Sequence, residues 1–237
     1  MSSVNQITKA LLENGPHSDL YTSLGCLLER IEQKIQKKST FQTYIYSYPK
    51  ILAHFSEFAS DKHSLSYEED LLVQGILMTY GWMPRIPRLD PEVKSSFKFK
   101  ESIEFLSKFN HKSQGDFYSI LLDKRNETYI KYLIQFVDNS LTAVSKILHF
   151  IRPEDFLIWD SKIRKTLGVS EFYRNNIEKY QEYISAFKSL RMEYESKDRI
   201  KKILEEAKEI FQYRISFARL IELALYVSAE ASSRKDS

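Results

Sequence analysis

Apolar residues recur every three or four positions along most of the chain, and no stretch alternates between apolar and polar residues as a half-buried strand would. The apolar face of residues 18–38 is the clearest, with Leu20, Leu24, Leu27, Leu28, Ile31 and Ile35. The same spacing, with its glycine, proline and capping boundaries, predicts further helices that include 4–13, 98–109, 117–122, 127–137, 141–151, 171–195, 198–213 and 215–227. We therefore expect an all-α fold of about ten helices.

Two residues inside the predicted helices should shape how the helices run. Pro49 lies within residues 40–59, where it should kink or split the helix because proline lacks an amide hydrogen and clashes with the preceding turn. Gly75 lies in the helix predicted after residue 66, and its missing side chain should allow a neighbouring helix to approach closely.

The length of 237 residues suits one large domain or two small ones. We predict a single all-α unit, residues 1–237, with two lobes as the alternative. In that alternative, residues 1–85 and 200–227 form one lobe and residues 98–196 form the other. The boundary would lie near the proline-rich segment 80–92.

Composition excludes several classes of protein. The hydrophobic share of 43% and the six glycines and six prolines do not fit a disordered or collagen-like chain. No apolar run is long enough to span a bilayer, so we expect no membrane association. Cys26 is the single cysteine and the histidines show no ligand spacing, so we predict no disulfide, metal site or cofactor and a cytoplasmic location.

A net charge of +3 permits nucleic acid as a partner without requiring it. The segment YGWMPRIPRLDPE, residues 80–92, combines prolines, arginines and large apolar side chains. It has two interpretations. Either it is a rigid connection that buries Trp82 and Met83, or Trp82 or Met83 wedges or stacks against bases while Arg85 and Arg88 contact phosphates.

Asp160 is the candidate catalytic residue, because it follows directly on the apolar run 156–159. Burying a carboxylate alone is costly, so this side chain should be hydrogen-bonded, ion-paired or functional. It could cap a helix over 161–167, form a salt bridge with Lys146 or Arg164, or take part in catalysis. Capping and catalysis are compatible.

Three basic residues adjoin Asp160: Lys162, Arg164 and Lys165. They form either a solvated helix face or an edge that contacts phosphate. An enzyme acting on a base within a duplex must also extrude that base, and Trp82, Met83 and Trp159 are the candidate wedges.

Three short segments together resemble the core of the helix-hairpin-helix DNA glycosylase superfamily: Thr142-Ala143, Arg152-Pro153 and Asp160-Ser161-Lys162-Ile163-Arg164-Lys165. The chain is also similar to an uncharacterised bacterial branch of 8-oxoguanine-glycosylase-like proteins. The resemblance implies a two-lobed helical fold, DNA rather than RNA as the partner, and excision of a flipped base. It also implies that Asp160 stabilises the cationic sugar formed as the base leaves.

The segment 136–141 matches the hairpin of that superfamily but contains no glycine, and its Ser140 is a candidate nucleic-acid contact. Leu141 occupies the position of the lysine nucleophile, so we expect no lyase chemistry there. Lys146 is a second catalytic candidate, as an alternative amine or as a partner that keeps Asp160 charged. No cysteine cluster is present for an iron–sulfur module.

These features leave three hypotheses. The first is a monofunctional DNA glycosylase. The second is a non-catalytic module that recognises nucleic acid or a nucleotide within a defence or repair complex. The third is an all-α interaction protein whose charged helices over 171–213 bind another protein.

Overall fold

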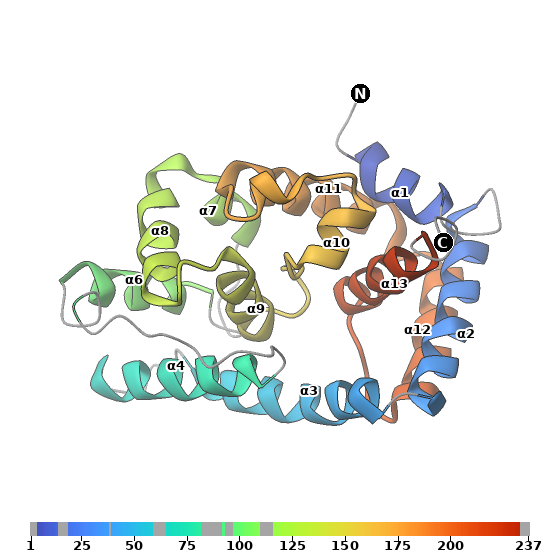
Figure 1. Cartoon of the computed structure of the whole chain (residues 1–237), viewed down its shortest axis with the longest axis horizontal. Helices are drawn as coiled ribbons and strands as arrows, with labels where there is room; N and C mark the ends of the chain where they lie inside the picture. Colours follow the sequence, from blue (N-terminus) through green and yellow to red (C-terminus); the bar gives the residue numbers. More distant parts are fainter. Residues whose placement is uncertain are drawn as a thin grey trace. The chain divides into compact units, whose positions relative to one another are not determined.

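A computed structural model describes residues 4–13, 19–37, 39–58, 65–81, 92, 97–109 and 116–232. Twelve α-helices and two 3-10 helices are assigned in these ranges, and no β-strand is found there. The all-α prediction is therefore confirmed. The helices of the first half are α1 (Val4–Glu13), α2 (Leu20–Lys37), α3 (Ser39–Glu57), α4 (Leu65–Tyr80), α6 (Phe97–Ser107) and α7 (Phe117–Leu122). They are followed by η1 (Lys124–Asn126), α8 (Glu127–Phe136), α9 (Leu141–Ile151), α10 (Ser161–Thr166), η2 (Glu171–Tyr173), α11 (Ile177–Tyr194), α12 (Asp198–Phe211) and α13 (Phe217–Ser232) (Figure 1).

Two predicted helices differ from the observed ones. Pro49 was expected to kink or split the helix; α3 continues through Pro49 without a break, so the alternative of a split is wrong. The predicted helix 171–195 is divided, because η2 and a short turn precede α11, which begins only at Ile177. The expectation for Gly75 is confirmed, since a Cβ atom there would lie 2.4 Å from the Phe55 ring.

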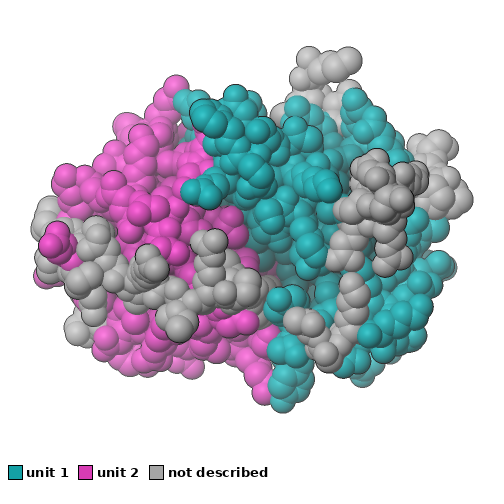
Figure 2. Space-filling view, viewed as in Figure 1, with its two compact units in different colours: residues 1–46, 157–174, 178–237 teal, residues 47–156, 175–177 magenta. Residues whose placement is uncertain are grey.

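The chain divides into two compact units, coloured separately in Figure 2. Unit 1 contains residues 1–46, 157–174 and 178–237, and unit 2 contains residues 47–156 and 175–177. These bounds differ from those of the two expected lobes. The second half of α3 and all of α4 group with α6 to α9 rather than with the C-terminal helices.

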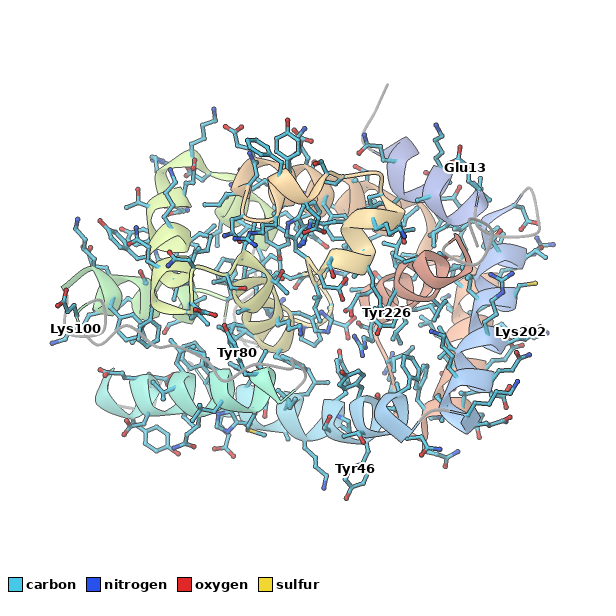
Figure 3. The ribbon with its side chains drawn as sticks, in the orientation of Figure 1. Glu13, Tyr46, Tyr80, Lys100, Lys202 and Tyr226 are labelled. Carbon is cyan, nitrogen blue, oxygen red and sulfur yellow. The ribbon has the colours of Figure 1, made fainter. Side chains whose placement is uncertain are left out.

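The core of unit 1 is built around α13, which packs against α1, α2 and α10. Helix α13 is apolar on nearly every face and its side chains are almost all buried, as expected for a central helix. Helix α2 also packs against α12. Tyr46, near the middle of α3, is 69% exposed and projects outward (Figure 3).

Unit 2 has an aromatic core formed by α4, α6, α8 and α9. The Phe99 and Phe136 rings lie 4.2 Å apart between centroids. His149 is fully buried, with Nε2 2.7 Å from the Tyr48 hydroxyl and Nδ1 2.7 Å from the Phe156 carbonyl oxygen. Within the described ranges, no helix has the length and apolar composition needed to cross a membrane.

Candidate functional site

Asp160 caps helix α10. The buried run Phe156–Trp159 leads into Asp160, whose backbone is extended (φ −101°, ψ 172°). Its Oδ1 accepts a hydrogen bond from the Ile163 amide at 2.8 Å, so the first of the three alternatives, a helix cap, is confirmed. No described residue of unit 1 donates a hydrogen bond to Oδ2, and the side chain is only partly buried. One carboxylate oxygen therefore caps the helix, and the other accepts no hydrogen bond from a described residue of unit 1.

The sequence analysis placed Arg164 on a solvated helix face or on a basic edge, whereas the structure buries it. It is 3% exposed, and its Nη2 forms an ion pair with Glu171 at 2.9 Å. Its Nη1 donates a hydrogen bond to the Trp159 carbonyl at 3.3 Å. The guanidinium thus joins the chain before α10 to the turn after it, and its burial differs from the exposed position that a phosphate contact would need.

Lys162 and Lys165 of α10 have different surroundings. Lys162 is half-buried; its Nζ donates a hydrogen bond to the hydroxyl of Tyr226 at 2.8 Å and lies 4.1 Å from the centroid of the same ring. Tyr226 belongs to α13 (Figure 3). Lys165 is exposed. These two lysines are the basic residues that the structure places beside Asp160.

A hollow of about 420 Å³ adjoins α10. It is lined by Ser161, Lys162, Lys165, Gly168, Val169, Ser170 and Glu171. Gly168 has a φ of 70°, which lets the chain turn sharply after the helix. Ammonium and hydroxyl groups at one hollow form a suitable environment for a phosphate oxygen.

A second hollow of about 270 Å³ shares residues 168–170 with the first. Its wall includes the rings of Trp159, Tyr173 and Tyr183, and Lys179 and Glu182 also line it. The aromatic rings of one hollow and the lysines of the other offer separate environments for a base and a phosphate.

A buried polar cluster lies behind this aromatic wall, and the sequence analysis did not single it out. The Tyr183 hydroxyl is buried and has no hydrogen-bond partner in the described part of the chain. Burial raises the pKa of Tyr183 well above its usual value, and the carboxylates of Glu222 and Asp160 raise it further. Glu222 forms an ion pair with Arg219 inside unit 1. The sequence offered one sign of this cluster, because Arg219 and Glu222 are charged residues three positions apart in the otherwise apolar segment FARLIELALYV.

The α8–α9 hairpin takes a left-handed backbone without glycine, since Asp138 and Asn139 have φ values of 54° and 51°. Ser140 caps α9, and its Oγ accepts from the Ala143 amide at 3.2 Å. Asn175 holds the same turn, donating from Nδ2 to the Asn139 carbonyl at 2.6 Å and accepting at Oδ1 from the Leu141 amide at 3.2 Å. Ser140 thus acts as a helix cap, and two amides at the start of α9 are already bound within unit 2.

The other candidates have different outcomes. Lys146 is 6% exposed on α9, in unit 2. Trp159 is 1% exposed and donates its indole N–H to the Arg174 carbonyl at 3.1 Å, so it is not a wedge. The other candidates, Trp82, Met83, Arg85 and Arg88, lie outside the described residues.

No group of three or more histidine, cysteine, aspartate or glutamate side chains in the described ranges is arranged to hold a metal ion. Comparison with known proteins gives no match of the chain to a protein-family model, a curated protein or a solved structure. Function is therefore inferred from the residues of this chain.

Proposed function

We propose that the protein binds nucleic acid and hydrolyses the N-glycosidic bond of an extruded base, with Asp160 as the catalytic carboxylate. The observation that carries the proposal is that the two carboxylate oxygens of Asp160 differ in their hydrogen bonding. Oδ1 is fixed by the Ile163 amide, while Oδ2 accepts no hydrogen bond from a described residue of unit 1. A carboxylate held in this way needs no reorganisation before it acts.

The charge distribution around Asp160 supports this chemistry. As the C1′–N bond breaks, the base leaves with the bonding electrons and the sugar gains positive charge, which a fixed carboxylate stabilises. Water then adds to C1′, and its proton is lost to solvent or to the departing base. Lys162 and Lys165 in the adjoining hollow would bind the flanking phosphate. Leu141, at the position where a lysine nucleophile is expected, favours hydrolysis without strand cleavage.

The test is base release from duplexes that carry a panel of damaged bases, followed by alkaline cleavage at abasic sites. Asp160→Asn is the informative variant, because asparagine caps a helix about as well as aspartate but carries no charge. We expect the native protein to release a base and Asp160→Asn to lose at least about 100-fold in rate, with an unchanged melting temperature. Activity that survives in Asp160→Asn would remove this residue from the mechanism.

A second candidate function is nucleic-acid recognition without catalysis. It is favoured by the hairpin, because the Leu141 and Ala143 amides already bind Asn175 and Ser140. Those amides are therefore not open to a phosphate in the usual manner of a helix N-terminus. This candidate predicts binding that weakens steeply with salt, and release of no base from any duplex in the panel.

A further inference from the structure

Phe172 is an exposed aromatic side chain beside the cationic hollow. It lies in η2 and is 87% exposed, more than any other large hydrophobic residue in the described part of unit 1. Its ring packs edge-to-face against that of Tyr173, with 5.3 Å between centroids. A phenyl ring held in water forgoes the free energy of burial, and its exposed faces are free to stack on a flat ligand.

The turn that carries Phe172 is firmly attached to the core of unit 1. The Phe172 amide donates to Ser170 Oγ at 3.3 Å. On one side, Glu171 forms its ion pair with the buried Arg164, and on the other the Arg174 carbonyl accepts from the buried Trp159 indole. The ring is therefore presented to solvent from an anchored turn.

Cationic residues lie on the same part of the chain as Phe172. Arg174 and Lys165 are exposed, and Lys162 and Lys165 line the 420 Å³ hollow, whose lining extends to Glu171, the residue before Phe172. The negative charge of Glu171 is offset by Arg164. Ser161 and Ser170 add hydroxyl groups to the same hollow. The combination of one ring, several cations and hydroxyls is complementary to an unpaired nucleotide with its phosphate.

We propose that Phe172 stacks on an unpaired base of a nucleic acid strand while Lys162 and Lys165 bind the adjacent phosphate. This inference rests on the nucleic-acid-binding part of the proposed function and is independent of glycosidic cleavage. It assigns the stacking role to a residue of the η2 turn, in place of the buried Trp159. A strand with an unpaired base offers a free face to the ring, whereas a fully paired duplex does not.

The test is fluorescence anisotropy of the full-length protein with a labelled single strand of about twelve nucleotides, and with its fully paired duplex, across a range of salt concentrations. We expect Phe172→Ala to weaken single-strand binding by about 5-fold or more and Phe172→Trp to preserve it. Met192→Ala removes another exposed apolar side chain, 76% exposed on α11, and should leave binding unchanged. Lys165→Ala should lower the slope of log affinity against log salt by about 0.7.

The outcomes separate the two proposals. If the native protein binds neither strand form, nucleic-acid binding itself is wrong and the stacking role fails with it. If the native protein binds and Phe172→Ala binds the single strand equally well, stacking is overturned while the proposed function stands. An equal loss on single strand and duplex also overturns stacking on an unpaired base. Because Phe172 is exposed, the melting temperature of Phe172→Ala should match that of the native protein.

Discussion

At the scale of single residues, two tyrosines one turn apart on α11 have opposite hydrogen-bonding states. The Tyr180 hydroxyl donates to the Leu157 carbonyl at 3.2 Å, whereas the Tyr183 hydroxyl is buried without a partner in the described part of the chain. A buried hydroxyl that makes no hydrogen bond opposes folding, while a bonded one contributes modestly to stability. Tyr183 is therefore tolerated at a cost, which is consistent with a role at the aromatic hollow that it lines.

Removing each hydroxyl should change stability in opposite directions. We expect Tyr183→Phe to stabilise the protein by about 1 kcal/mol, because the unbonded oxygen is removed and the ring remains. Tyr180→Phe should destabilise it by about 1 kcal/mol, because the Leu157 carbonyl loses its donor. Each change corresponds to roughly 2–4 °C in melting temperature for a chain of this size. Equal destabilisation by both variants would contradict the difference between the two sites.

At the scale of elements, two helix glycines have unlike surroundings. Gly75 of α4 faces the Phe55 ring, and a Cβ atom there would lie 2.4 Å from Phe55 Cζ. At Gly25 of α2, no atom of the described residues beyond its chain neighbours and its own helix backbone lies within 4 Å of the position that a Cβ would take. The first glycine is required by packing between helices of unit 2, while the second only weakens its own helix.

The same substitution should therefore have opposite effects at the two glycines. Gly75→Ala should destabilise the protein by about 1–3 kcal/mol, because the added methyl group displaces a buried ring. Gly25→Ala should stabilise it by about 0.5–1 kcal/mol through helix propensity alone. Urea unfolding followed by circular dichroism measures both effects. A loss of stability in Gly25→Ala would show that α2 is more closely covered than described.

The α8–α9 hairpin is another element that depends on particular side chains. Asp138 and Asn139 both take positive φ, which most residues avoid and which aspartate and asparagine tolerate best after glycine. Asn175, distant in sequence, bonds to both sides of the turn. The hairpin keeps its geometry without glycine because these three residues satisfy its backbone.

At the scale of the whole molecule, buried tyrosines link stability to alkaline pH. Burial raises the pKa of Tyr180 and of Tyr183 above their usual value of 10, and it raises the pKa of Tyr213 to about 12. Below pH 10 these phenols are protonated in both the folded and the unfolded chain, so their contribution to stability is complete. Above pH 10 the unfolded chain loses their protons more readily, and the free energy of unfolding falls until the folded pKa values are passed.

We therefore expect the melting temperature to fall from about pH 10 upward. Each buried tyrosine should contribute up to about 1.4 kcal/mol per pH unit in this range. Tyr183→Phe should make the free energy of unfolding fall less steeply with pH above pH 10, by the contribution of one tyrosine. Near neutral pH no tyrosine titrates, so the stability of the variant there should not depend on pH through this residue. A parallel fall in the native protein and in Tyr183→Phe would show that this phenol ionises normally in the folded state. Thermal unfolding between pH 8 and pH 11 tests the expectation.

Much of the local structure could be predicted because its causes lie within a few residues. The bounds of α7 and α9 follow from apolar spacing and from adjacent capping or proline residues. The cap at Asp160 and the close approach at Gly75 also follow from residue type and position. The alternative of a split at Pro49 was wrong, since a long helix with buried residues on both sides of a proline can offset one missing hydrogen bond.

The sequence by itself determined the all-α class and most helix bounds, and it offered capping as one role of Asp160, because short-range spacing and capping residues decide these features. Tertiary structure alone decided that Arg164 and Trp159 face the core and that Phe172 faces solvent. It also decided that the Glu222 carboxylate raises the pKa of Tyr183. It also grouped residues 157–174 with both ends of the chain. Burial depends on which distant segment covers a side chain, and periodicity within one segment carries no information about that.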